Sequence, residues 1–150
     1  MKKVLVLFMV LSSLTLMAAC SGESTSGSDY VHEITERFFA MQFFEMSMNS
    51  DDFIGRTIRY EGMFTTNYWE PTSEYFHFVY RYTDGCCGPV EPLGLEVYLG
   101  NIEPLADNAW VEVTGVLERF QEGGQSFLRL NVTSLIEKEE RGSEFVMGLN

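Results

Sequence analysis

Two adjacent cysteines, Cys86 and Cys87, carry the clearest reactive chemistry in this sequence. They lie in a stretch over residues 84–89 that contains two glycines and a proline, where the backbone can turn and bring both sulfur atoms to one side. On a strand, two neighbouring side chains would instead point to opposite faces. The pair has three interpretations: thiolate ligands of a soft cation such as zinc, a strained and easily reduced disulfide, or a structural staple of the loop.

Further ligands or catalytic partners for this pair are few. His77 is the candidate third ligand, and it lies in a predicted strand on the face that also carries Val79 and Arg81. The sequence contains no His-x-x-x-His, Cys-x-x-Cys or Gly-x-Ser-x-Gly motif and no glycine-rich phosphate-binding loop. A single strand histidine is more often a surface or hydrogen-bonded residue than a ligand or a base. We therefore expect a protein that is not an enzyme.

Cys20, the remaining cysteine, follows a segment typical of an export signal. Two lysines precede an unbroken apolar run over residues 4–10, and small residues stand before the cysteine. The sequence Leu-Met-Ala-Ala-Cys at residues 16–20 resembles a bacterial lipobox, which implies diacylation of the Cys20 sulfur and removal of residues 1–19. Such acyl chains suffice for stable anchoring. The sequence thus predicts a lipid anchor on the extracytoplasmic side of the cell membrane; the alternative is a secretory signal with an unrelated cysteine.

The part of the chain that can fold is small and acidic. Residues 20–29 have the polar composition of a flexible tether and leave about 120 residues for one domain. The net charge of −12 becomes −14 once the two lysines of residues 1–19 are removed. This charge argues against a nucleic-acid partner, because polyanions bind to basic surfaces. It also leaves the acyl chains, rather than attraction to anionic lipid, to hold the protein at the membrane.

Hydrophobic periodicity predicts one helix followed by five strands. A repeat near 3.6 residues indicates an amphipathic helix over residues 30–49. Its apolar stripe is expected to consist of Val31, Ile34, Phe38, Met41, Phe44 and Met48, widened by Phe39, Phe43 and Met46. Packing of this stripe against the sheet is favoured, and binding of a partner or of lipid is the alternative. Beyond residue 53 the period changes to two. The expected strands span residues 57–64, 75–82, 93–99, 110–118 and 127–132.

Five strands with an additional element between the third and the fourth follow the plan of the OB-fold barrel. Residues 101–108 would supply this element as a helical turn. Gly62 and Gly115 stand at corresponding mid-strand positions, where glycine typically marks a bulge or a sharp bend. A β-sandwich and an SH3-like barrel are the alternative architectures.

The loop predicted over residues 67–74 carries aromatic side chains at or near its ends. Tyr68, Trp69 and Tyr75 could form a platform for a ligand, as in other OB-like proteins. Packing in the core or at the rim of the barrel explains these residues equally well.

Three segments resemble one known family: residues 52–62, the cysteine pair with residues 92–95 downstream of it, and residues 110–115. The family is the YcgQ-like group of permease-associated membrane proteins, whose extracytoplasmic C-terminal domain is OB-like. The resemblance covers residues 33–137. It implies an OB-like fold, a permease-type membrane protein as partner, and a role in transport or metal homeostasis. Members usually carry N-terminal membrane helices, which a lipid anchor would replace here.

The predicted organisation is a lipoprotein signal peptide (1–19), a tether (20–29), an OB-like domain with a preceding amphipathic helix (30–140) and a C-terminal tail (141–150). The predicted function is that of a binding module of the cell envelope. It would capture a thiophilic metal ion through Cys86 and Cys87, helped by His77, or assist a permease-type partner. The alternatives are a structural or interaction domain with the cysteines as a loop staple, and a thiol–disulfide redox pair.

Overall fold

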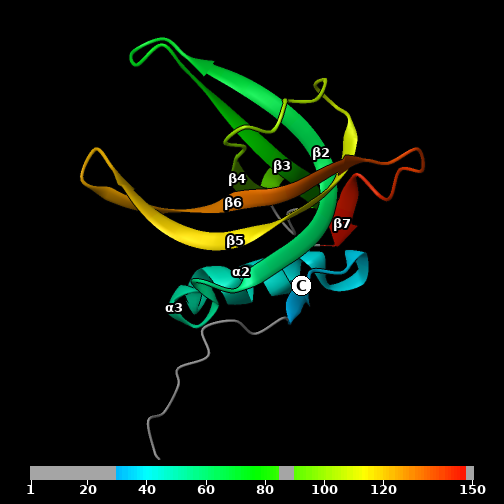
Figure 1. Cartoon of the computed structure of the whole chain (residues 1–150). Coiled ribbons are helices and arrows are strands. Elements are labelled where there is room, and N and C mark those ends of the chain that lie inside the picture. The colour runs from blue at the N-terminus through cyan, green and yellow to red at the C-terminus, as the bar shows by residue number, and fades with distance from the viewer. Residues whose placement is uncertain (1–29, 85–89, 148–150) are drawn as a thin grey trace, which may run out of the picture.

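Five long strands close into a barrel in the computed structural model, which describes residues 30–84 and 90–147 (Figure 1). Strand β2 pairs with β3 and β5, β5 pairs with β6, and β4 joins β6 to β3, so that the circle closes. The β4–β6 pairing is parallel, and the other four pairings are antiparallel. This arrangement confirms the predicted mainly β, OB-like fold. The barrel strands are β2 (Thr57–Trp69), β3 (Glu74–Asp84), β4 (Glu91–Tyr98), β5 (Trp110–Glu122) and β6 (Gln125–Glu137).

Two hairpins extend well beyond the barrel wall. The β2–β3 pairing continues to Trp69 and Glu74, and the β5–β6 pairing continues to Glu122 and Gln125. The strands are therefore longer than predicted, because aromatic cross-strand pairs prolong both ladders where the sequence indicated loops. Figure 1 shows both hairpins projecting on the same side of the molecule.

The prediction of one helix over residues 30–49 is wrong in its first part. Strand β1 (Val31–Glu33) pairs in parallel with the start of β2, and the helical segment begins only with the 3₁₀ turn η1 (Glu36–Phe38). The helices α2 (Phe39–Met48) and α3 (Ser50–Phe53) follow. The N–H of Ile34 donates to the carbonyl oxygen of Arg59 at 2.9 Å. The open edge of β2 thus satisfies backbone groups that local periodicity assigned to a helix.

Helix α2 buries the opposite side from the one expected to form its main stripe. Phe39, Phe43 and Met46 pack into the core, whereas Met41, Phe44 and Met48 are 50%, 54% and 68% exposed. Phe39 and Phe43 both pack edge-on against Tyr60 in β2. Both faces of the helix are apolar, so periodicity could not distinguish the buried one.

Gly62 and Gly115 permit close approach of neighbouring strands, as predicted for bends in the barrel. A Cβ atom on Gly115 would lie 2.5 Å from the carbonyl oxygen of Asn131, and the β5–β6 register shifts at this point. A Cβ atom on Gly62 would lie 2.7 Å from the carbonyl oxygen of Tyr80.

Residues 101–108, expected to hold a helical turn, instead form turns and irregular backbone.

The segment expected to be a C-terminal tail, residues 141–150, contains strand β7 (Phe145–Met147). This strand pairs in parallel with the end of β3, and Val146 is buried in the core. The domain therefore extends at least to Met147.

Within the described residues, no helix has the length and apolar character needed to cross a membrane.

Candidate ligand-binding cleft

Strand β3 turns its most aromatic side away from the core. Val79 and Arg81 are 0% and 2% exposed, and they point into the barrel. Because side chains alternate along a strand, the intervening residues point outward. We call this outward set the aromatic face: Phe76, Phe78, Tyr80 and Tyr82, all only half-buried. A row of large rings on the outside of a small barrel is typical of an interaction site rather than of the fold itself.

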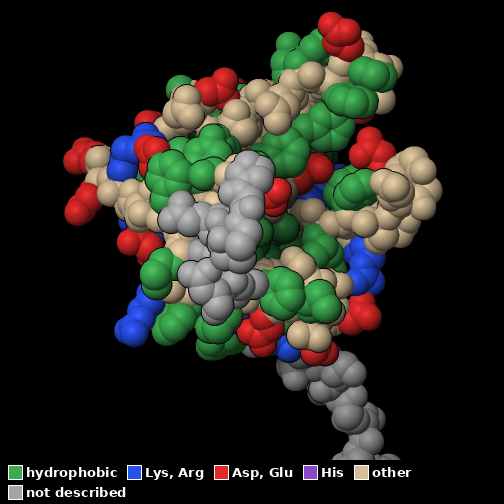
Figure 2. Space-filling model, turned by 180° about the vertical axis from the view of Figure 1, so that it is seen from behind, with side chains coloured by type: hydrophobic (Ala, Val, Ile, Leu, Met, Phe, Trp, Pro, Cys, Tyr) green, Lys and Arg blue, Asp and Glu red, His purple; other side chains and the backbone are tan. Residues whose placement is uncertain are grey.

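The aromatic face runs into a cleft between the two projecting hairpins, which we call the hairpin cleft. Figure 2, from behind, shows these hairpins as separate projections with a hollow between them. The cleft has a volume of about 570 Å³. Its aromatic lining consists of Tyr68, Trp69, Phe76, Phe78, Phe120 and Phe127. A second hollow of about 620 Å³ shares Asn67 and Phe78 with it and continues along Tyr80 and Tyr82. Both volumes are in the range of small-molecule sites.

Cross-strand ring pairs shape the two hairpins. Tyr68 and Tyr75 pack with ring centroids 5.0 Å apart, and Phe120 and Phe127 pack at 5.7 Å. Tyr68, Trp69 and Tyr75 are 52%, 56% and 66% exposed. The alternative of core packing is therefore wrong for these three residues, and they remain available to a ligand.

Charged residues in and beside the cleft are mainly acidic. Glu96 and Glu122 line it, while Arg129 lines the adjoining hollow together with both. The Nε of Arg129 donates to Glu118 Oε1 at 2.6 Å, and its guanidinium lies over the rings of Tyr98 and Phe120. Burial raises the pKa of Glu96, opposed by Arg129 and reinforced by Glu122. The cleft thus combines apolar walls with a carboxylate that is costly to ionise.

The cysteines of the predicted site, Cys20, Cys86 and Cys87, lie outside the described residues. The strands on either side of the Cys86–Cys87 segment are paired: Thr83 lies opposite Glu91, and its Oγ1 donates to the carbonyl oxygen of Glu91 at 3.3 Å. The segment therefore joins two adjacent strands.

His77, the predicted third ligand, lies inside the described part of β3. Its Nδ1 is 2.9 Å from Thr66 Oγ1, and its ring stacks on Phe64. Burial lowers the pKa of His77. Asp84, at the end of β3, follows His77 by seven positions, which is roughly 23 Å along an extended strand. The described residues contain no group of three or more His, Cys, Asp or Glu side chains that could hold a metal ion.

The sequence indicated the aromatic residues of the β2–β3 hairpin but not the cleft as a whole. The signal was available in the alternation of Phe76, Phe78 and Tyr80, which gives β3 more aromatic surface than a strand wall needs. Taken alone, the charged residue Arg81 on the opposite side indicates the reverse orientation, with the aromatic side facing the core. Val79 pairs with Phe64 on β2 and with Leu95 on β4, and both are core residues. This pairing determines that the Val79 side of β3 faces inward.

The fold and the cleft define a small OB-like barrel domain with an open aromatic groove. The chain belongs to the DUF1980 family, because the model of the DUF1980 C-terminal domain matches residues 20–147. The match includes every strand of the barrel together with β7. Neither a curated protein nor a solved structure matches the chain.

Proposed function

We propose that this domain is a non-enzymatic binding module whose ligand occupies the hairpin cleft. The observation that carries the proposal is the outward orientation of the aromatic face of β3 into a groove between two projecting hairpins. Exposed rings at this density cost free energy in water, which a bound ligand would recover. The loops between the first and second and between the fourth and fifth barrel strands flank ligand sites in other OB-folds.

A binding screen followed by amide chemical shifts tests this proposal. Carbohydrates, short peptides and organic cations are titrated into the purified protein, and a true ligand should shift signals of β3 and of both hairpins. Trp69→Ala should weaken binding at least tenfold without unfolding the domain, since Trp69 is 56% exposed. Phe44→Ala is the matched control, because Phe44 is equally exposed (54%) on α2, away from the cleft. Shifts confined to residues outside the cleft would contradict the proposal.

We also propose that Cys20 anchors the protein as a lipoprotein on the extracytoplasmic face of the cell membrane. The lipobox-like sequence at residues 16–20 supports this. Strand β1 and helix α2 lie at one end of the barrel, and the β2–β3 hairpin projects from the other (Figure 1). An anchor preceding Tyr30 would then hold the cleft away from the lipid, accessible to a ligand or to a permease-type partner. Cys20→Ser should abolish both palmitate incorporation and recovery in the membrane fraction; retention of either would contradict the anchor.

Capture of a thiophilic metal ion by Cys86 and Cys87 is the second candidate function. The pairing of Thr83 with Glu91 favours it, because it holds the two ends of the cysteine segment on adjacent strands. We expect about one zinc ion per chain, lost in the Cys86→Ser/Cys87→Ser variant, and two thiols that become titratable only with chelator. The absence of bound metal would contradict metal capture, and thiols that then become titratable only after reduction would indicate a disulfide, as expected for the staple or the redox pair.

A further inference from the structure

We infer that the ligand of the hairpin cleft is an organic cation, an ammonium group on an apolar stem, with Glu96 as its counter-ion. This inference rests on the proposed function of the cleft and specifies the chemistry of its ligand. It is carried by the position of one carboxylate among aromatic rings.

Glu96 lies in the wall of the cleft, on strand β4, which is flanked by β3 and β6. Its register partners are Phe78 on β3 and Arg129 on β6. Among the described residues, no hydrogen bond or ion pair engages its carboxylate. Arg129, the neighbouring cation, is already bound to Glu118 at 2.6 Å. Glu96 therefore presents a half-buried negative charge without a bound counter-ion in the described part of the chain.

The surrounding rings are suited to the same ligand. The face of an aromatic ring attracts a cation, and cages of rings with a carboxylate recognise quaternary ammonium groups. The domain already uses this interaction close by, since the guanidinium of Arg129 lies 4.7 Å from the ring centroid of Phe120. Trp69, the ring type that binds cations best, is 56% exposed in the cleft wall.

The electrostatic surroundings disfavour an anion. Two of the residues that line the cleft, Glu96 and Glu122, are acidic, and the whole chain has a net charge of −12. Burial of the Glu96 carboxylate, together with Glu122, raises its pKa, and a bound cation would reverse this by stabilising the charged form. A bound cation thus reduces the free-energy cost of keeping the buried Glu96 carboxylate charged, whereas a neutral ligand does not.

Choline and its neutral isostere 3,3-dimethylbutan-1-ol test this inference, because they share shape and differ in charge. In calorimetric titrations of the purified protein at pH 7, choline should bind at least tenfold more tightly than the alcohol. Glu96→Gln should remove this difference by weakening choline alone. Glu137→Gln, an exposed glutamate at the far end of β6, is the matched control and should change neither affinity. The affinity for choline should also fall as the pH is lowered through the raised pKa of Glu96.

The outcomes separate this inference from the proposed function. Equal affinity for choline and the alcohol, or choline binding that survives Glu96→Gln, overturns the assignment of an organic cation. If a carbohydrate or a neutral peptide then shifts the amide signals of the cleft residues, the proposed binding function is supported with a different class of ligand. If neither probe binds and no compound of the screen shifts the cleft signals, both proposals fail.

Discussion

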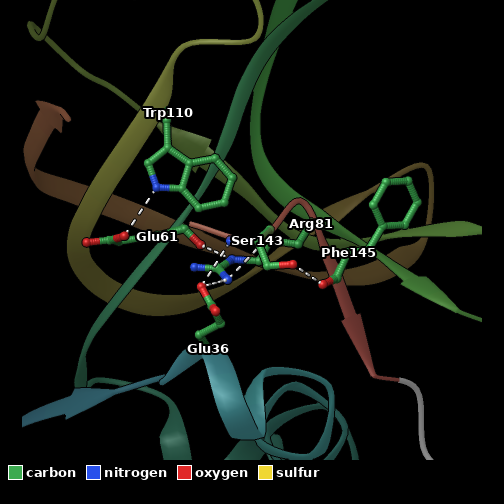
Figure 3. A network of polar contacts seen from close by, with 6 residues as sticks. All are labelled: Glu36, Glu61, Arg81, Trp110, Ser143 and Phe145. Carbon is green, nitrogen blue, oxygen red and sulfur yellow. Dashed lines mark hydrogen bonds and ion pairs between the residues drawn. The ribbon is translucent and has the colours of Figure 1, made fainter. Parts of the chain in front are cut away.

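The Nη1 atom of Arg81 lies 3.0 Å from Glu36 Oε2, and the arginine side chain is only 3% exposed (Figure 3). Its Nε also donates to the carbonyl oxygen of Glu61 at 2.7 Å, and its Nη1 to that of Ser143 at 3.2 Å. The guanidinium lies 4.8 Å from the ring centroid of Trp110. One buried cation thus connects η1, β2, β3 and the segment that leads into β7.

Replacement of Arg81 should destabilise the domain strongly. Arg81→Leu removes the arginine donor from two partly buried carbonyl oxygens and the partner of Glu36, and we expect a loss of about 3 kcal/mol in the free energy of unfolding. Glu36→Gln should cost less, about 1 kcal/mol, since Glu36 is half-exposed and the other bonds of Arg81 remain. Urea unfolding at pH 7 measures both. Equal midpoints for wild type and Arg81→Leu would contradict the structural role of this network.

The same network should make stability depend on acid pH. The N–H of Ser143 and the guanidinium of Arg81 hold the pKa of Glu36 below its ordinary value of 4.5. A carboxyl whose pKa is lower in the folded state stabilises the fold above its unfolded pKa and loses this contribution as the pH falls. We therefore expect the unfolding free energy of wild type to decline below about pH 4.5 more steeply than that of Glu36→Gln. Parallel declines would assign the acid sensitivity to other carboxylates.

Neighbouring phenylalanines on α2 should differ sharply in their effect on stability. Phe43 is 1% exposed and packs on Tyr60, so Phe43→Ala should cost about 3–5 kcal/mol. Phe44 is 54% exposed, so Phe44→Ala should change the unfolding free energy by no more than about 0.5 kcal/mol. Thermal unfolding of the two variants compares them directly. A large loss for Phe44→Ala would mean that its face of α2 is covered in the protein.

These residues also show what could be predicted from the sequence. The five period-two segments and the glycines at residues 62 and 115 indicated the barrel, because strand alternation and close strand approach are local properties. Local patterns could not decide which side of β3 or of α2 is buried, since both sides of each carry large apolar residues. They also missed β1 and β7, whose three-residue pairings form only on the edges that β2 and β3 provide. The hairpin cleft could not be predicted either, because it depends on the pairing of five strands and not on any local pattern.

Protonation of His77 should weaken the fold in a separate pH range. Burial against Phe64 lowers the pKa of His77 below its ordinary value of 6.5, although Asp107 opposes the shift. The unfolded state then binds more protons just below pH 6.5, so the unfolding free energy should decrease as the pH falls from 7 toward the folded-state pKa. His77→Gln should flatten this step without altering the one below pH 4.5. A step of unchanged size in the variant would exclude His77 as its source.

Gly94 should be required for the close packing of β4 on β3 beside the aromatic face. A Cβ atom at this position would overlap the carbonyl oxygen of Val79 and lie 2.7 Å from the Cα of Tyr80. Both atoms belong to the backbone of β3, which cannot move without separating the strands. Gly94→Ala should therefore cost about 3 kcal/mol or more and shift the amide signals of Tyr80 and its neighbours. Gly123→Asn is the control, because the φ of +57° at this turn is one that asparagine tolerates and nothing lies near its Cβ position. If the two variants were equally stable, the tight β3–β4 contact could not be what shapes this side of the barrel.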